Sequence, residues 1–234
     1  MSFNPHISVL IPLYNNIEFL EESLESVITQ SYDNWEVIIG IYGHKIGSDI
    51  EKKAMDILHK YDRFQYKIRV IVYNTQYRSE TMNHMVIDST YDYIAILDVG
   101  DIWMSKKLEN QVPLLQHYDV VGTSCEYFGA VKGYPNIPIG DLKNTNFLIC
   151  NPVISCSAII RKCYINWDDS EYQHKIKGFE DYDMWLRLKY KERSFYNINK
   201  ILCKHFVHKE SVLNNIDTIY LNELKSKWKK EFGL

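Results

Sequence analysis

Residues 93–103 read YIAILDVGDIW and decide how the chain folds, because an apolar run stops abruptly at two carboxylates. Asp98 and Asp101 lie three residues apart, with Gly100 between them. A buried strand that delivers acids to its own C-terminal end is the usual ligand position of an open α/β sheet. Two nearby carboxylates repel each other, and a hard divalent cation relieves that repulsion. The structural alternative is a strand followed by an Asp-Gly turn, so the rest of the chain must distinguish the two.

The composition indicates an ordinary folded protein. The chain has 234 residues, enough to bury a substantial core in one large or two small domains. Its hydrophobic content of 46% and charged content of 24% are typical of soluble globular proteins. A formal net charge of −3 gives no electrostatic support for a nucleic-acid partner.

Neither a signal peptide nor a membrane span is expected. The N-terminus lacks the basic, apolar and small-residue pattern of a signal peptide, and no apolar run approaches the roughly 20 residues that cross a bilayer. The five cysteines contain no CxxC pair, which predicts reduced thiols in a cytoplasmic protein rather than a disulfide framework or a zinc site. They are Cys125, Cys150, Cys156, Cys163 and Cys203.

Apolar runs of strand length alternate with amphipathic segments through the first half of the chain. This alternation predicts an α/β fold with a doubly wound, mostly parallel central sheet flanked by helices. Asn15 or Asn16 is expected to cap the first helix, and Ser48 with Glu51 fits a capping box before the second. The predicted strands are residues 7–11, 35–41, 66–73 and 93–97, and the predicted helices are residues 17–30, 50–61 and 80–89.

The second half is less regular. Residues 108–115 predict a helix that Pro113 kinks, and residues 180–190 predict a compact helix. Residues 127–146 are rich in Gly, Pro and Asn without a clear period, and a long loop of this kind is more often functional than idle. Residues 119–124 and 154–160 read as further strands. Because no repeat or linker divides the chain, we expect a single domain.

Four segments resemble motifs of the family 2 glycosyltransferases, which have the GT-A fold. Residues 7–16, ISVLIPLYNN, resemble the family's opening strand, and residues 93–103 resemble its acidic motif, usually LDSDDIW. Residues 178–188, GFEDYDMWLRL, are similar to the family's GFEDYDLWLRL helix. Residues 203–211, with His208, resemble the closing R-x-H-x-x-S element. The segments occur in the family's order and the match covers most of the chain.

The resemblance implies a metal-dependent, inverting glycosyltransferase. Such an enzyme moves a sugar from a nucleotide-diphosphate sugar, a UDP- or GDP-sugar, to a hydroxyl of a glycan acceptor or similar glycoconjugate. A Mn²⁺ or Mg²⁺ ion would neutralise the charge that develops on the leaving diphosphate, and aspartate oxygens favour such hard ions. Residues 1–103 would then form the nucleotide-sugar-binding half and residues 104–211 the acceptor-binding half.

The resemblance also assigns roles to single residues. Asp98, Asp101 and His208 would hold the metal, with Asp98 mainly on the nucleotide-sugar side. His208 could contact the diphosphate instead, and it also reads as an ordinary surface histidine. Asp181 would be the general base, with Asp183 or Glu180 as alternatives that only geometry can separate. Acids at the first turn of a helix have a structural explanation too, because the helix dipole favours them there. The expected substrate-binding residues are Pro12, Tyr14, Arg78, Asp98, Glu180 and Trp185.

Several positions depart from the family pattern. Gly100 occupies the place of the middle acid of the DSDD motif. The second strand ends in Ile41-Tyr42-Gly43-His44, where the family usually has Asp-Asp-Gly-Ser. These losses motivate a second hypothesis, a catalytically degenerate GT-A domain that binds a glycan or a protein. A nucleotidyltransferase is less favoured, because no Gly-rich phosphate loop occurs near Pro12.

Residues 212–234 predict a basic amphipathic C-terminal helix. Its apolar residues recur at intervals of four, with lysines between them. Packing on its own domain or on a second subunit, as in a homodimer, is favoured over peripheral contact with an anionic membrane surface. The apolar positions are Ile216, Tyr220, Leu224, Trp228 and Phe232.

Overall fold

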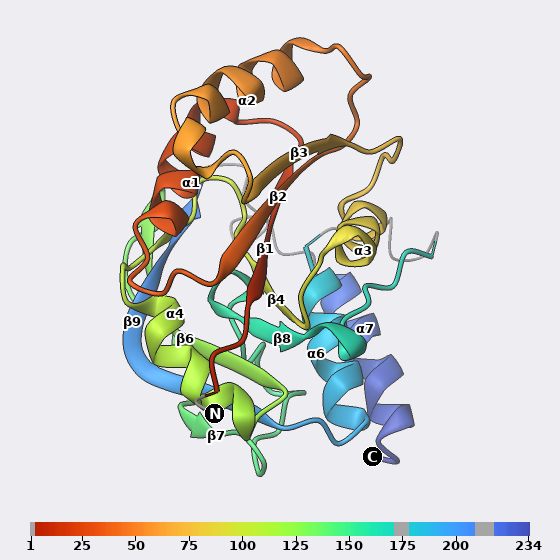
Figure 1. Cartoon of the computed structure of the whole chain (residues 1–234). Helices are drawn as coiled ribbons and strands as arrows, with labels where there is room; N and C mark the ends of the chain where they lie inside the picture. Colours follow the sequence, from red (N-terminus) through yellow and green to blue (C-terminus); the bar gives the residue numbers. More distant parts are fainter. Residues whose placement is uncertain (1–2, 171–177, 209–217) are drawn as a thin grey trace.

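The computed structural model describes residues 3–170, 178–208 and 218–234, and these parts form a mixed α/β fold around one sheet (Figure 1). The strands are β1 (Ile7–Leu13), β2 (Trp35–Ile41), β3 (Ile68–Val72), β4 (Tyr93–Ile96), β5 (Ile102–Trp103), β6 (Val120–Gly129), β7 (Gly140–Asp141), β8 (Ile159–Arg161) and β9 (Phe195–Val207). Among the described residues the sheet has nine strands in the order β3-β2-β1-β4-β8-β6-β9-β5, and β7 pairs with β9.

Helices cover both faces of this sheet. Figure 1 shows α1 and α2 on one side of the first strands, α3 on the other side, and α6 beside α7. The α-helices are α1 (Leu20–Ile28), α2 (Asp49–His59), α3 (Arg78–Asp88), α4 (Lys107–Gln111), α6 (Glu180–Tyr190) and α7 (Thr218–Glu231). Short 3₁₀ turns are η1 (Ile17–Phe19), η2 (Asp62–Phe64), η3 (Val112–Gln116), η4 (Ser155–Ser157) and η5 (Lys162–Tyr164).

β1 is the central strand of the first half, and all seven of its residues are buried. Because successive side chains of a strand point to opposite faces, Val9 and Ile11 enter the core with α1 and α2, whereas Leu10 enters the second core with α3 and α6. β1 pairs in parallel with β2 and β4, and β2 pairs in parallel with β3. The residues that follow these parallel strands therefore meet at one edge of the sheet, as the sequence predicts.

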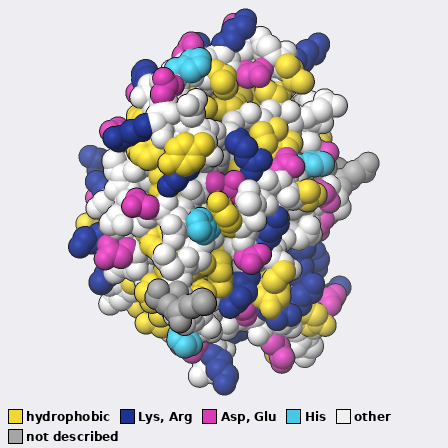
Figure 2. All heavy atoms as spheres, viewed as in Figure 1, with side chains coloured by type: hydrophobic (Ala, Val, Ile, Leu, Met, Phe, Trp, Pro, Cys, Tyr) yellow, Lys and Arg dark blue, Asp and Glu magenta, His cyan; other side chains and the backbone are white. Residues whose placement is uncertain are grey.

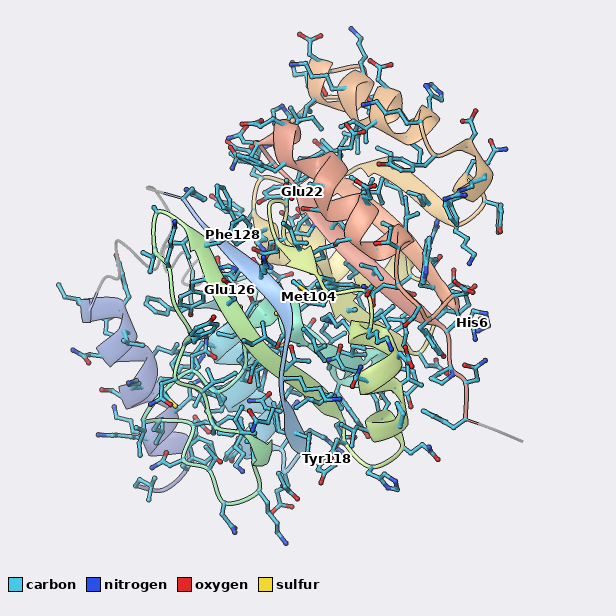
Figure 3. All side chains as sticks on the ribbon, turned by 90° about the vertical axis from the view of Figure 1, so that its left-hand side faces the viewer. His6, Glu22, Met104, Tyr118, Glu126 and Phe128 are labelled. Atoms are coloured by element: carbon cyan, nitrogen blue, oxygen red, sulfur yellow. The ribbon has the colours of Figure 1, made fainter. Side chains whose placement is uncertain are left out.

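The second half adds antiparallel pairs and one long parallel ladder. β8 pairs antiparallel with both β4 and β6. β6 and β9 pair in parallel along ten positions, with register shifts at Ser124, and Figure 3 shows them side by side. β5 pairs antiparallel with β9. This arrangement brings the end of β9 against the turn that follows β4.

Several predicted local features differ in the structure. Asn16 precedes η1 in a left-handed conformation and makes no side-chain capping bond. The capping box before α2 is wrong, because Ser48 makes no side-chain cap and Glu51 instead accepts the Gly47 N–H. The strand predicted at residues 154–160 contains the 3₁₀ turn η4, and only its last two residues belong to β8.

Two predicted boundaries also move. Arg78, expected in the loop before a helix, is the first residue of α3. The predicted loop at residues 127–146 contains the end of β6 and the short strand β7.

The C-terminal helix α7 packs on α6 of the same chain. Leu224 and Trp228 are buried, and the Trp228 indole N–H donates to Asp183 on α6 at 2.8 Å. Packing on its own domain, the favoured alternative, is what the structure shows, although Ile216 lies outside the described residues. Within the described segments, none of the helices combines the length and the apolar character that crossing a bilayer requires.

Candidate active site

Three charged side chains from distant segments meet at the C-terminal edge of the parallel strands. Arg78 Nη2 lies 2.9 Å from Asp98 Oδ1, and Arg78 Nη1 lies 3.4 Å from both carboxylate oxygens of Asp181. Asp98 follows β4, whereas Arg78 and Asp181 stand in the first turns of α3 and α6. Acidic, basic and histidine side chains gather in the middle of the face shown in Figure 2.

The positions of these groups change their proton affinities. Burial raises the pKa of Asp98, and the neighbouring Asp101 and Asp181 raise it further, while Arg78 lowers it. Burial alone would lower the pKa of Arg78, but Asp181 and Asp98 outweigh that effect and raise it. Burial also raises the pKa of Glu180. One guanidinium thus serves a cluster that holds more negative than positive charge, and a cation would relieve the remaining repulsion.

The three acids of α6 have different surroundings. Asp181 Oδ1 accepts the Trp167 indole N–H at 2.6 Å, which fixes its orientation. Glu180 is half-buried, and its Oε2 accepts the N–H of Gly178. Asp183 is only 1% exposed and faces Trp228 and Lys227 of α7. Asp183 therefore stabilises the α6–α7 contact, which leaves Asp181 and Glu180 as the acids that a substrate can reach.

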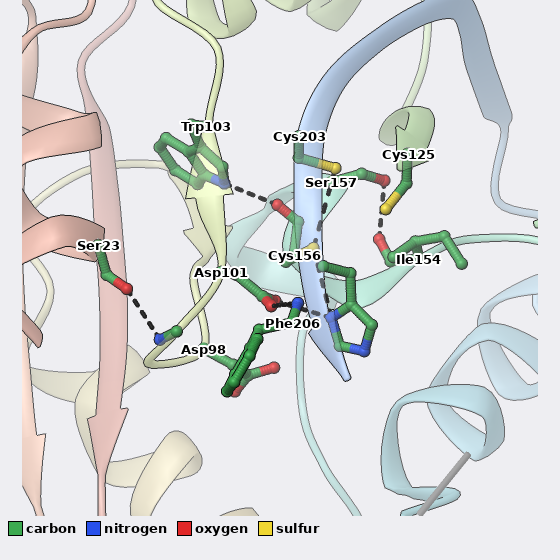
Figure 4. A network of polar contacts seen from close by, with 12 residues as sticks. Ser23, Asp98, Asp101, Trp103, Cys125, Ile154, Cys156, Ser157, Cys203 and Phe206 are labelled. Atoms are coloured by element: carbon green, nitrogen blue, oxygen red, sulfur yellow. Dashed lines mark hydrogen bonds and ion pairs between the residues drawn. The ribbon is translucent and has the colours of Figure 1, made fainter. Parts of the chain in front are cut away.

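Asp101 is held from behind by the end of β9 (Figure 4). Its Oδ1 accepts the backbone N–H of Phe206 at 2.7 Å, and its Oδ2 lies 3.0 Å from His205 Nδ1. Burial alone would lower the pKa of His205, but the Asp101 carboxylate raises it to about 9. A protonated His205 and the amide of Phe206 together compensate the buried charge of Asp101.

Gly100 has a backbone conformation that explains the missing acid. It lies in a turn closed by the Asp101 N–H to Asp98 carbonyl bond, its φ is +100°, and its own N–H donates to Ser23 Oγ at 2.9 Å. A Cβ atom at this position would come 2.9 Å from Phe206 Cδ1. A side chain here would meet both a left-handed backbone and an aromatic ring, so glycine suits this turn.

Aromatic rings occupy the place where the family's second-strand acid is expected. Tyr14 follows β1 and is 47% exposed. Its ring stacks on that of Tyr42, which follows β2, with the ring centroids 5.2 Å apart. The ring of His44 lies 5.6 Å from that of Tyr14. Gly43 adopts φ +70°, and a Cβ there would come 2.3 Å from the Tyr14 ring. Burial raises the pKa of Tyr42 to about 12, so it remains a neutral aromatic hydroxyl.

The structure brings most of the predicted residues to this edge. Tyr14, Arg78, Asp98, Asp101 and Asp181 lie there as the sequence predicts. Two further predicted residues lie in β9's continuation and in β1. His208 directly follows β9, with its ring 6.3 Å from that of Phe206, and Pro12 is a buried residue of β1. Ser211 of the closing motif lies outside the described residues.

Trp185 was expected to bind substrate, and the structure contradicts this prediction. Its side chain is fully buried and packs edge-on against Phe195 in the second core. Trp185 lies one turn after Asp181, in the part of α6 where residues 182–186 are buried, and it belongs to the second core.

Three site residues escaped the sequence reasoning. Trp167 lies in the irregular segment after η5 and has no motif around it. His205 lies in β9, where alternation places it on the face of Cys203, a signal that could have pointed to it. In the sequence Tyr42 stands out only as a lost acid, because its stacking on Tyr14 depends on the parallel register of β1 and β2.

Comparisons with known proteins identify the family that this chain resembles. The family model described as glycosyl transferase family 2 matches residues 8–193. The chain is 30% identical over 213 residues to the putative glycosyltransferase EpsE of Bacillus subtilis, covering 87% of this chain and 74% of that relative. It is 23% identical to the putative teichuronic acid biosynthesis glycosyltransferase TuaG of the same organism, covering 92% and 84%. The chain spans only 31% of an uncharacterised glycosyltransferase of Rickettsia felis.

Solved structures share the fold. TarS of S. aureus with UDP-GlcNAc superposes with a TM-score of 0.73 at 16% identity, covering 97% of this chain and 66% of that one. The mannosyltransferase PcManGT of Pyrobaculum calidifontis, in complex with GDP-Man and Mn²⁺, superposes with a TM-score of 0.63 at 13% identity, covering 90% and 59%. The chain thus spans somewhat less than two thirds of these solved chains. The GT-A fold predicted from the sequence is confirmed.

Proposed function

This chain belongs to glycosyltransferase family 2, and from that premise we propose that it transfers a sugar, with inversion, from a nucleotide-diphosphate sugar to an acceptor hydroxyl. The observation that carries the proposal is the convergence of Asp98, Arg78 and Asp181 at the edge where parallel strands end. In this proposal residues 1–103 bind the donor and residues 104–211 bind a glycan acceptor. Residues 212–234 contain α7, which packs on α6 and stabilises it. The free cysteines support a cytoplasmic location.

A divalent cation fits the donor set of this edge. Asp98 offers a partly exposed carboxylate, 32% exposed, and its raised pKa reflects burial and neighbouring negative charge that a cation would offset. Asp98, Asp101 and His208 are the residues that we assign to Mn²⁺ or Mg²⁺. When bound, the ion supplies Lewis-acid neutralisation of the diphosphate leaving group. The contacts of Asp101 with the His205 ring and the Phe206 N–H fix the position of its carboxylate.

Arg78 is the residue that we assign to the diphosphate. Its guanidinium now pairs with Asp98 and Asp181, and both pairs are partly buried. An arriving diphosphate offers oxygen acceptors of higher charge, so Arg78 can exchange a carboxylate for a phosphate. Arg78 stands at the N-terminus of α3, where the positive end of the helix dipole disfavours its guanidinium charge. A phosphate that replaces the carboxylate would still compensate this charge.

The aromatic rings of Tyr14 and Tyr42 are assigned to the nucleobase. Stacking of a base on exposed aromatic rings is favourable and tolerates either a pyrimidine or a purine. TarS with UDP-GlcNAc and PcManGT with GDP-Man make UDP- and GDP-sugars the donors to test. Tyr14 is exposed and Tyr42 backs it, so the pair forms a supported platform.

Asp181 is the general base in this proposal. Its Oδ1 is oriented by Trp167, and Arg78 pairs with the same carboxylate. A base that takes the acceptor proton on the face opposite the leaving group gives one displacement and therefore inversion. Glu180 is the alternative base because it is also partly accessible.

A degenerate binding module remains the second candidate, since Tyr42 replaces the usual acid of the second strand. Calorimetric titration with UDP-GlcNAc and GDP-mannose, with and without Mn²⁺, separates the two. We expect one donor to bind in a Mn²⁺-dependent manner, and binding to weaken at least about 10-fold in Asp98→Asn but not in the exposed control Asp56→Asn. If neither donor binds under either condition, the enzyme proposal fails.

A further inference from the structure

A cluster of three buried thiols lies behind the carboxylate edge and plays no part in the proposed transfer. Cys125 comes from β6, Cys156 from η4 and Cys203 from β9, so residues distant in sequence converge. Each of the three is at most 1% exposed. Figure 4 shows them on neighbouring elements beside Asp101.

The spacing of the sulfur atoms suits a metal ion. Their three Sγ atoms all lie within 4.8 Å of one another, and Cys156 Sγ is 3.8 Å from Cys203 Sγ. Metal–thiolate bonds of about 2.3 Å at tetrahedral angles separate two sulfur ligands by about 3.8 Å. Cys156 and Cys203 thus have the separation of two ligands on one ion, and the sulfur of Cys125 lies close enough to join them after a small shift.

A buried cation faces the same cluster. Lys107 of α4 is 0% exposed, and its Nζ has no hydrogen-bond partner among the described residues. That Nζ lies 3.9 Å from the centre of the Trp103 ring. Burial lowers the pKa of Lys107 to about 8, while negative charge on Cys203 or Cys156 would raise it. An ammonium placed here calls for a neighbouring anion.

Charge selects the class of ion. Three thiolates and a divalent cation carry a net charge of −1, which one ammonium balances, whereas a monovalent cation would leave −2. Thiolates prefer soft or borderline ions such as Zn²⁺ over the hard Mn²⁺ or Mg²⁺ that carboxylates bind. The thiol cluster and the carboxylate edge are therefore chemically distinct.

We propose that Cys125, Cys156 and Cys203 form a structural site for a thiophilic divalent cation of the zinc class, with Lys107 balancing its charge. The bound ion would join β6, β9 and η4 directly behind Asp101. It would stabilise the fold, because ligands that bind only the folded state raise its stability. The absence of a CxxC pair led us to expect no zinc site. That pattern is not needed here, because each of the three ligands comes from a different element.

Cd²⁺ is the probe that tests the proposal, because its thiolate charge-transfer absorption does not arise from carboxylates. The whole reduced chain is refolded anaerobically with Cd²⁺ and excess Mg²⁺, so that the ion can reach buried ligands and the carboxylates are occupied. We expect one equivalent to bind, with charge-transfer absorption and a higher thermal midpoint. Cys156→Ala should lower the affinity at least about 10-fold.

The double variant Cys150→Ser/Cys163→Ser is the matched control, since it removes the two thiols outside the cluster and should leave Cd²⁺ binding unchanged. A ¹¹³Cd resonance of the wild-type protein gives the number of sulfur ligands without any variant. Absence of charge transfer after refolding, a resonance typical of oxygen ligands, or loss of binding in the double variant would each overturn the proposal. None of these readouts depends on sugar transfer.

Discussion

Gly100 is the residue at which this chain departs most clearly from its family's acidic motif, and its backbone supplies the reason. The sequence shows that an acid is absent, but it cannot show that φ is +100° or that Phe206 covers the position. The ring comes from β9, about a hundred residues further along the chain. Contacts between such distant segments are set by strand pairing rather than by local pattern.

Restoring the family acid should therefore harm the fold. We predict that Gly100→Asp lowers the free energy of unfolding by about 1–3 kcal/mol, because a side chain meets both a positive φ and the Phe206 ring. Urea unfolding measures the change. Gly140→Ala is the matched control, with φ +84° and open space around its Cβ, so it isolates the backbone cost. Equal losses in the two variants would show that Phe206 is irrelevant.

Tyr14 carries a prediction about donor binding. Removing its ring in Tyr14→Ala should cost about 1–3 kcal/mol of binding, the usual value of a base stacked on an aromatic ring. Calorimetry with the donor that binds gives this difference. Tyr66→Ala is the control, since Tyr66 is 77% exposed and precedes β3 at the opposite edge of the sheet. Unchanged donor affinity in Tyr14→Ala would remove the aromatic platform from the site.

At the scale of elements, sequence periodicity predicted the first half well, because buried parallel strands and amphipathic helices leave clear patterns. The strand predicted at residues 35–41 matches β2, and in the second half the helix predicted at residues 180–190 matches α6. The capping contacts of Ser48 and Asn16 were wrong, since several local hydrogen bonds compete at a helix start. The second half was less predictable because antiparallel pairing of short strands such as β8 depends on distant partners.

The contact between α6 and α7 gives a prediction about stability. Trp228→Phe preserves an aromatic ring but removes the N–H that reaches the buried Asp183. We expect the unfolding free energy to fall by about 1–3 kcal/mol, the usual cost of a buried acceptor that loses its donor. Lys230→Gln, on the exposed side of α7, is the control. An unchanged thermal midpoint in Trp228→Phe would mean that Lys227 alone satisfies Asp183.

Lys107 of α4 makes stability depend on pH. Its pKa falls from 10.5 to about 8 on folding because of burial. Between these values the unfolded chain holds a proton that the folded chain has lost, so rising pH stabilises the folded state. In reduced, metal-free protein, Lys107→Met should be the more stable form at pH 7, by on the order of 1–3 kcal/mol. Its advantage should shrink as pH rises from 8 to 10.

Denaturant unfolding at several pH values measures this dependence. Lys106→Met is the control, because Lys106 is exposed in the same turn. A pH profile of Lys107→Met parallel to that of the wild type would show that Lys107 keeps its ordinary proton affinity when folded.

At the scale of the whole molecule, the site depends on two halves meeting at one sheet edge. The sequence motifs predicted Asp98, Asp101 and Asp181 together, but not the bridge that Arg78 makes between Asp98 and Asp181. Nor could the sequence place Trp167, because it has no periodic or motif signal, and the alternation of β9 indicates only the face on which His205 lies. Trp185 was predicted as a substrate-binding residue, but its side chain is buried, and the motif alone does not separate core residues from acceptor contacts.

Loss of sugar transfer in Asp181→Asn, with donor binding retained, tests the central claim most directly. Nucleotide release is measured with the donor found by calorimetry and a panel of glycan acceptors, beside Glu180→Gln and the exposed control Asp56→Asn. The account predicts that Asp181→Asn binds the donor within a few-fold of the wild type while transfer falls roughly 100-fold or more. Full transfer activity in Asp181→Asn would contradict the account.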